Sequence, residues 1–203
     1  MAGIKRSCGL KAVGGALRPD STSPQHRPSR GVKPLPQLHT ELGLPADYAA
    51  TRGLALQPEA DEAALVTIAT TDDARPIRLL PPAAVAWEKM HAAAHSAGLT
   101  LIPLSGFRSV ARQAEIIRAK LAAGQPLAEI LRFVAAPGYS EHHTGRALDL
   151  GAPGEPPLDE SFARTAAFAW LSAHAESHGF HLSYPRENPH GIAYEPWHWC
   201  WRE

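Results

Sequence analysis

The stretch SEHHTGRALD at residues 140–149 decides how the fold is read, because it joins a turn to a strand and carries two potential metal ligands. His142 offers an imidazole and Asp149 a carboxylate. Gly145 and the strand-like alternation of residues 146–149 argue against one helix through both. We therefore expect a loop that carries His142 and a strand that carries Asp149. Taken alone, the pair is better explained by a surface histidine in a turn and an aspartate at a strand end.

A second motif, YEPWHW at residues 194–199, changes that balance. Glu195 and His198 lie among aromatic residues that bury well but solvate charge poorly, so both groups need partners, and a metal would supply one. Two histidines and one aspartate are three ligands for zinc, with a fourth position left for water, as in catalytic sites. Glu195 would then be free to act as a general base. The two motifs together predict a zinc hydrolase.

Other histidines offer weaker alternatives among the eleven in the chain. His91 and His95, and likewise His174 and His178, are spaced to share one face of a helix. Neither pair has a glutamate directly after its first histidine, which the helical zinc-protease motif requires. In addition, the segment around Ser140 lacks the second glycine of a serine-hydrolase nucleophile elbow. We therefore assign the metal to His142, Asp149 and His198.

Composition excludes several classes of protein. The formal net charge is +0 over 203 residues, so no global field favours nucleic acid. No apolar run approaches the ~18 residues that a membrane-spanning helix needs. The two cysteines, Cys8 and Cys200, are too few for a disulfide framework or a tetrathiolate zinc site. We expect a monomer with neither a nucleic-acid partner nor a transmembrane segment.

The chain divides into a tail and one domain. Residues 1–40 are rich in proline and arginine and too poor in large apolar residues to offset their ordering entropy, so we expect a disordered tail. Residues 4–17 do not have the composition of a secretory signal peptide. Residues 41–203 would form the zinc hydrolase domain, which is patterned best from residue 78 onward.

Within that domain, strands and helices interleave without a regular βαβ repeat, which predicts an α+β fold. Helices are expected at residues 83–97, after Pro81 and Pro82, from the cap Ser109 to Gly124, at 127–134, and at 161–179. Strands are expected at 65–69, 99–104, 146–150, 180–184 and 193–201.

The motifs together resemble the VanY-type D-alanyl-D-alanine carboxypeptidases. The resemblance covers residues 78–201 and rests on S-x-H-x-x-G-x-A-x-D at 140–149, on E-x-x-H at 195–198, on SGFRS at 105–109 with Gln113 after it, and on LSYP at 182–185. Phe107 stands where family members often have tyrosine. The resemblance implies a small α+β domain with a central antiparallel sheet flanked by helices and a zinc site at the sheet.

The same resemblance implies the roles of the site residues. His142, Asp149 and His198 would hold one zinc ion, and Glu195 would be the base. Four residues would bind the substrate, a peptidoglycan stem peptide outside the cytoplasm: Arg108, Gln113, Ser140 and Tyr184. The expected reaction is removal of the terminal D-alanine from D-Ala-D-Ala. An L,D-carboxypeptidase, an L-alanyl-D-glutamate endopeptidase and a non-catalytic, zinc-stabilised binding module remain as alternatives.

Overall fold

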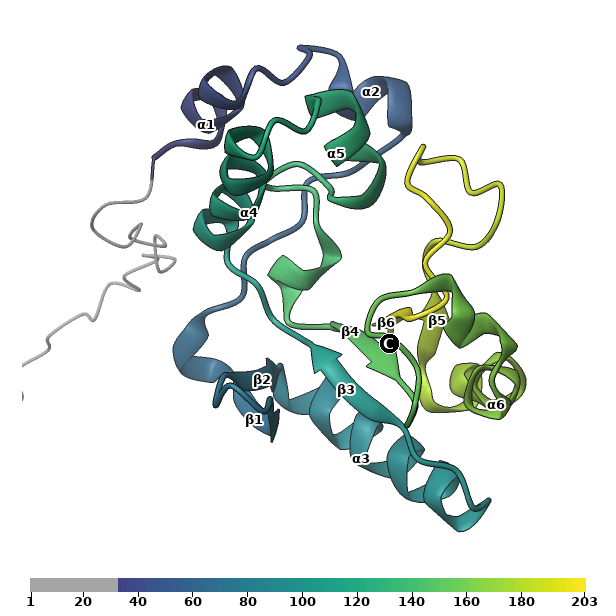
Figure 1. Ribbon diagram of the computed structural model, residues 1–203. Coiled ribbons are helices and arrows are strands. Elements are labelled where there is room, and N and C mark those ends of the chain that lie inside the picture. Colours follow the sequence, from purple (N-terminus) through teal and green to yellow (C-terminus); the bar gives the residue numbers. More distant parts are fainter. Residues whose placement is uncertain (1–32) are drawn as a thin grey trace, which may run out of the picture. The chain divides into compact units, whose positions relative to one another are not determined.

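The centre of the fold is a four-stranded antiparallel sheet in the order β3-β4-β6-β5 (Figure 1). Its strands are β3 (Ile102–Ser105), β4 (Ala147–Gly151), β6 (His198–Trp201) and β5 (Phe180–Leu182). Every residue of β4 is buried, because this strand is paired along both edges. The register places Asp149 opposite both Ser105 and His198. Three residues that are far apart in the sequence thus meet in one row across the sheet.

The structure is a computed structural model, and it describes residues 33–203. A separate antiparallel hairpin joins β1 (Val66–Thr70) to β2 (Pro76–Leu79). In the part of the chain that the structure describes, no helix is both long enough and apolar enough to cross a membrane. Most of the predicted tail, and with it the interpretation of residues 4–17, lies outside the described residues.

One apolar cluster packs around the sheet. It includes α3 (Pro81–Ser96), the 3-10 turn η3 (Glu160–Arg164), α6 (Ala166–His174) and the 3-10 turn η4 (Ala175–His178). The two prolines that open α3 occupy its first turn, where a backbone N–H has no helical partner to lose. Fully buried side chains from helix and strand alike fill the space between them, among them Met90, Leu148, Leu171 and Phe180.

A second apolar cluster within the described residues is built mainly from helices, without a strand. It contains α1 (Leu35–Leu42), α2 (Tyr48–Arg52), α4 (Val110–Ala122) and α5 (Leu127–Phe133), which gather at the other end of the ribbon in Figure 1. Ser109 caps α4 as predicted, since its Oγ accepts a hydrogen bond from the Arg112 amide at 3.1 Å. Two further 3-10 turns, η1 (Glu62–Ala64) and η2 (Glu141–Thr144), lie in the connections.

The predicted α+β class and the central antiparallel sheet are confirmed, and so are the strand near 65–69 and the helices expected near residues 83–97, 109–124 and 127–134. The single long helix expected at 161–179 is wrong. Thr165 adopts an extended backbone, and its side chain caps α6 by accepting a hydrogen bond from the Phe168 amide. A residue that caps a helix interrupts any helix running through it, so the segment forms η3, α6 and η4 instead.

Two boundaries also differ from those expected. Residues 35–40, assigned to the tail, belong to α1 (Leu35–Leu42), because Leu35, Leu38 and Leu42 recur at helical spacing and the latter two are buried. The last strand begins at His198 rather than at residue 193. The amides before it are used elsewhere: Ala193 donates to Arg132 O at 2.7 Å and Glu195 donates to Tyr184 O at 3.1 Å.

Gly106, directly after β3, lies in close contact with the backbone of β2. A Cβ atom at this position would lie 2.5 Å from the backbone oxygen of Arg78, a separation that real Cβ atoms do not adopt. The next amide, of Phe107, donates to that same oxygen at 2.8 Å. Only glycine allows the two backbones to meet here.

We expect Gly106→Ala to destabilise the protein by more than about 2 kcal/mol, because the added methyl group must push a backbone segment away. The matched control is Gly151→Ala in β4, whose nearest neighbour is the movable side chain of Leu104 at 3.1 Å. Urea unfolding of both variants measures the difference. Equal stability of the two variants would show that the close approach at Gly106 is not a constraint.

Candidate metal centre

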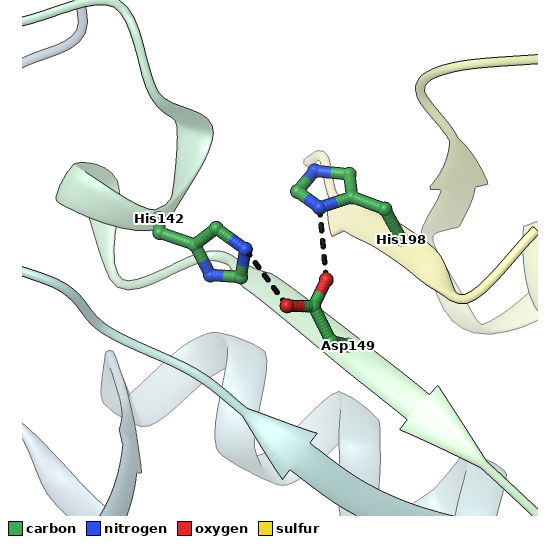
Figure 2. A group of neighbouring side chains, drawn as sticks. All are labelled: His142, Asp149 and His198. Carbon is green, nitrogen blue, oxygen red and sulfur yellow. Dashed lines mark hydrogen bonds and ion pairs between the residues drawn. The ribbon is translucent and has the colours of Figure 1, made fainter. Parts of the chain in front are cut away.

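Three buried side chains converge on one point beside the central sheet (Figure 2). His142 comes from η2, Asp149 from β4 and His198 from β6. One Asp149 oxygen lies 3.2 Å from His142 Nε2, and the other lies 3.0 Å from His198 Nδ1. One ligand atom from each residue lies within 4.8 Å of the others. Four-coordinate zinc, with bonds of about 2.0–2.1 Å, places its ligands roughly 3.3 Å apart, so these separations suit it.

The outward-facing nitrogen of each imidazole is fixed by an acceptor. His142 Nδ1 lies 2.7 Å from the carbonyl oxygen of Gly106, and His198 Nε2 lies 3.0 Å from a Glu141 carboxylate oxygen. Because a carbonyl or carboxylate oxygen can only accept here, each of these nitrogens carries a proton and donates. The other nitrogens, His142 Nε2 and His198 Nδ1, are thereby directed toward Asp149. Such outer contacts orient the histidines of known metal sites.

The protonation of the cluster also favours a cation between its members. Burial lowers the pKa of His142, so its Nε2 carries a lone pair that faces a carboxylate oxygen. Burial opposes charge on His198 as well, but the carboxylates of Asp149 and Glu141 outweigh it and raise the pKa of His198 to about 10. Burial also opposes the ionisation of Asp149, yet the two histidines hold the pKa of Asp149 below its usual range. A metal ion would satisfy all three groups, with displacement of the His198 proton.

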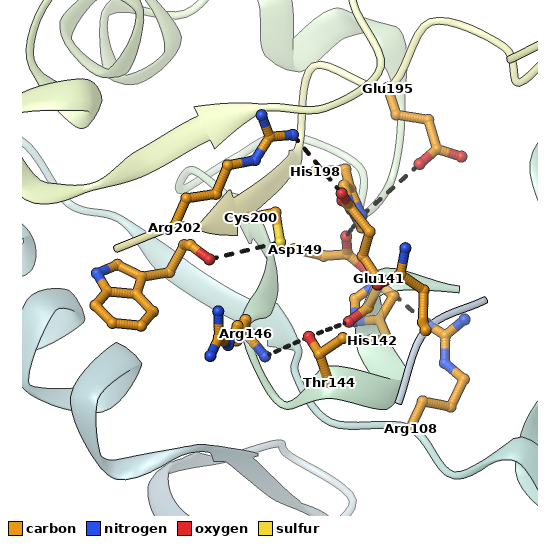
Figure 3. A network of polar contacts seen from close by, with 12 residues as sticks. Arg108, Glu141, His142, Thr144, Arg146, Asp149, Glu195, His198, Cys200 and Arg202 are labelled. Atoms are coloured by element: carbon orange, nitrogen blue, oxygen red, sulfur yellow. Dashed lines mark hydrogen bonds and ion pairs between the residues drawn. The ribbon is translucent and has the colours of Figure 1, made fainter. Parts of the chain in front are cut away.

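Glu141 was not among the site residues predicted from the sequence. Figure 3 shows it between His198 and Arg202, whose Nη2 lies 3.8 Å from the second Glu141 oxygen. Burial opposes its ionisation, but the hydrogen bond from His198 and the nearby Arg202 lower the pKa of Glu141 to about 2. The one indication in the sequence was that this carboxylate directly precedes His142. Its hydrogen-bond partner, however, is His198, 57 residues away, and only the fold reveals that contact.

Glu195 lies beside the cluster without belonging to it. Its Oε2 is 3.9 Å from His198 Nδ1, the nitrogen that faces the candidate metal position. The side chain is buried, and burial raises the pKa of Glu195 to about 7. A carboxylate that exchanges its proton near neutral pH can act as a general base and then as an acid. The structure therefore places a carboxyl with this property beside the three clustered side chains.

Arg108 is held next to the cluster by side chains on two elements. Its Nη1 donates to Gln113 Oε1 at 3.1 Å, and its Nη2 donates to Ser105 Oγ at 3.2 Å. The same Nη2 lies 3.9 Å from Asp149. Gln113 is fixed in turn, because its Nε2 donates to Ala135 O at 2.6 Å. Gln113 thus orients the guanidinium, and both side chains line the adjoining cavity.

That cavity has a volume of ≈ 680 Å³ and also contains the two remaining predicted residues, Ser140 and Tyr184. The Tyr184 ring packs against His198 with 4.9 Å between ring centroids. Burial raises the pKa of Tyr184, so its hydroxyl remains protonated and available as a donor at neutral pH. Every residue predicted for the site therefore borders one cavity.

The alternative histidine pairs do not form such a site. His91 packs against Trp87, and the ring of Trp170 lies beside both His174 and His178. The last two are divided between α6 and η4, so they do not share one regular helix. Among residues 33–203, the cluster of His142, Asp149 and His198 is the one group of three or more such side chains that could hold a metal ion.

The chain is similar to known proteins along this domain. It is 38% identical over 120 residues to the putative carboxypeptidase YodJ of Bacillus subtilis, which is 57% of this chain and 43% of that protein. It is 33% identical over 117 residues to a D-alanyl-D-alanine carboxypeptidase of Enterococcus faecalis, which is 53% of this chain and 42% of that one. The chain thus matches less than half the length of either curated relative.

Solved structures agree with this similarity. The LdcB LD-carboxypeptidase superposes with a TM-score of 0.64 at 30% identity, over 72% of each chain. VanYB in complex with D-alanine-D-alanine gives a TM-score of 0.57 at 26% identity, over 72% of this chain and 81% of that one. The family model VanY, described as D-alanyl-D-alanine carboxypeptidase, matches residues 76–203. Since that match covers more than half of the sequence and includes the whole metal cluster, the chain belongs to the VanY family.

Proposed function

We propose that this chain is a zinc-dependent carboxypeptidase that hydrolyses the terminal D-Ala-D-Ala bond of peptidoglycan stem peptides. The observation that carries the proposal is the position of Glu195, a buried carboxyl with a pKa of about 7, beside a cluster with the donor set of catalytic zinc. The family description and the D-alanine-D-alanine complex of VanYB support the substrate.

In the proposed reaction, zinc held by His142, Asp149 and His198 would lower the pKa of a water molecule and polarise the scissile carbonyl. Glu195 accepts the proton as that water attacks. The buried surroundings of Glu195 favour its protonated form, so the proton is not lost to solvent at once. Glu195 then delivers it to the amine of the departing D-alanine.

Arg108 supports cleavage at a chain end. A guanidinium can bind a terminal carboxylate with two parallel hydrogen bonds, and Ser105 and Gln113 hold this one 3.9 Å from Asp149. An endopeptidase has no terminal carboxylate to bind at this place. Tyr184 and Ser140 add a hydroxyl each to the same cavity and would position the peptide.

One alternative is favoured by a specific observation, and a second is opposed by one. The LdcB and DacB neighbours are described as L,D-carboxypeptidases, and that reaction would use the same metal, base and arginine. A non-catalytic binding module would need no base, so the buried Glu195 argues against it. We further propose that the protein acts as a monomer with one zinc ion, because every residue of the site comes from one chain.

The first prediction concerns the metal. His142→Ala, Asp149→Ala and His198→Ala should each reduce the zinc content of the purified protein, because each removes one of three ligands. His91→Ala and His174→Ala are the matched controls and should retain full zinc. Elemental analysis, with circular dichroism to verify folding, measures the result. Loss of zinc from His174→Ala alone would move the site to that histidine.

Glu195→Ala should separate metal binding from turnover. We expect normal zinc content and a fall in kcat of at least about 100-fold, the usual contribution of a general base. Release of D-alanine under saturating substrate measures kcat. Near-normal turnover by the variant would remove Glu195 from the role of base.

The bond that is cleaved can be determined by offering pentapeptide and tetrapeptide muropeptides side by side. We expect loss of one D-alanine from the pentapeptide only, detected by mass spectrometry. Loss from the tetrapeptide would make the protein an L,D-carboxypeptidase, cleavage beside L-alanine an endopeptidase, and binding without mass loss a binding module.

Arg108→Ala should reduce kcat/KM for the pentapeptide by about 10- to 100-fold, as expected for the loss of hydrogen bonds between charged groups. The control is Arg112→Ala, an arginine on the solvent-exposed side of α4 that pairs with Glu115. Unchanged D-alanine release by Arg108→Ala would exclude this residue from recognition of the terminal carboxylate.

A further inference from the structure

The cavity at the candidate metal centre continues well beyond it. Its volume of ≈ 680 Å³ is that of a site for a drug-sized ligand, and a pair of alanine residues is smaller than such a ligand. Side chains that the proposed reaction does not use line its remainder, among them Phe133 and Leu158. The cavity therefore has space for the part of the substrate that precedes the scissile bond.

Leu158 combines two features that folding alone does not favour. Its φ of 55° lies in the left-handed region, which is disfavoured for residues other than glycine. Its side chain is 48% exposed, although it is large and apolar. The residues that follow Leu158 are fixed by a local hydrogen bond, because the side chain of Asp159 accepts from the Ser161 amide at 2.8 Å. Backbone strain of this kind is concentrated at sites that bind ligands.

Two other described residues with positive φ show that Leu158 is a separate case. Ala74, at 62°, has only a methyl group and lies in the turn between β1 and β2. Glu187, at 61°, is charged and exposed to water. Within residues 33–203, Leu158 is the one residue that joins a positive φ to a large apolar side chain on the cavity.

Phe133 faces the same cavity from a different part of the fold. It is the last residue of α5, in the helical cluster, and it is 54% exposed. Leu158 belongs to the segment between β4 and η3, next to the sheet. The described residues include six large apolar side chains that are at least 36% exposed, and only these two line the cavity. Exposed apolar surface inside a binding cavity is typical of ligand contact.

We propose that Leu158 and Phe133 form an apolar clamp that binds the aliphatic side chain of the residue preceding the D-Ala-D-Ala unit, so that these two residues determine specificity. This inference rests on the proposed function. The nearby acidic groups are already engaged, since Glu160 pairs with Arg186 at 3.1 Å and Asp159 caps η3. The exposed apolar surface of Leu158 and Phe133 is therefore available to contact a substrate side chain.

The test uses two synthetic substrates in which no side-chain charge is present: diacetyl-L-Lys-D-Ala-D-Ala, with both amines acetylated, and acetyl-Gly-D-Ala-D-Ala. We expect the zinc-loaded wild type to prefer the lysine peptide at least about tenfold in kcat/KM, as for contacts of one or more methylene groups. Leu158→Gly and Phe133→Ala should each reduce that preference to within about threefold, through a higher KM for the lysine peptide. In both variants, kcat/KM for the glycine peptide should fall less than kcat/KM for the lysine peptide, because the glycine peptide has no side chain to lose a contact.

Leu158→Gly carries a second readout, because glycine relieves the positive φ. Its melting temperature should be no lower than that of the wild type, so a change in KM cannot be attributed to loss of folding. Ala74→Gly relieves the same type of strain outside the cavity, and Val85→Ala removes exposed apolar surface from α3. Both controls should retain the full preference for the lysine peptide.

The outcomes separate the two proposals. Hydrolysis of both peptides by the wild type at equal kcat/KM would overturn the clamp and leave the proposed function intact. Retention of the full preference by Leu158→Gly and Phe133→Ala would overturn it as well. Hydrolysis of neither peptide would overturn the D,D-carboxypeptidase function, and the clamp would fall with it.

Discussion

The site depends on one buried charge, the carboxylate of Asp149 in the middle of the central sheet. Its strand is paired on both edges and the side chain is almost fully buried, so an uncompensated charge there would cost several kcal/mol. The antiparallel register supplies compensation by placing His198 directly across from it, and η2 brings His142 to its other oxygen. The sheet thus acts as a rigid support, which keeps metal ligands in place more accurately than loops would.

The surrounding contacts determine which atoms face the centre. Gly106 contributes its carbonyl oxygen to His142 while its missing side chain allows the hairpin to approach, so one residue serves both the fold and the site. Glu141 accepts the corresponding hydrogen bond from His198 through its carboxylate. Contacts of this kind orient the histidine ligands of metal proteins. Glu195 differs from these carboxylates. Few partners compensate its burial, so its pKa rises whereas those of Glu141 and Asp149 fall.

The sequence pointed to His142, Asp149, Glu195 and His198 because each of the two motifs is compact and its residue types are chemically specific, and the resemblance to the VanY family joined the two motifs. The helix capped by Ser109 was likewise indicated by its capping residue, and the strand that contains Asp149 by its alternating pattern. Thr165 was misjudged because its apolar neighbours continue the helical pattern through a residue that acts as a cap. The contact of Glu141 with His198 and the left-handed backbone of Leu158 depend on register and on neighbours distant in sequence. Periodicity and composition carry no information about either.

The most direct test of the account is to locate zinc in crystals of the loaded protein by anomalous diffraction at the zinc absorption edge. The account predicts one ion within about 2.0–2.2 Å of His142 Nε2, His198 Nδ1 and an Asp149 oxygen. Glu141 should remain on Nε2 of His198, and Glu195 should lie outside the coordination sphere. An ion bound at His174 or His178, or one coordinated by Glu195 in place of Asp149, would contradict it.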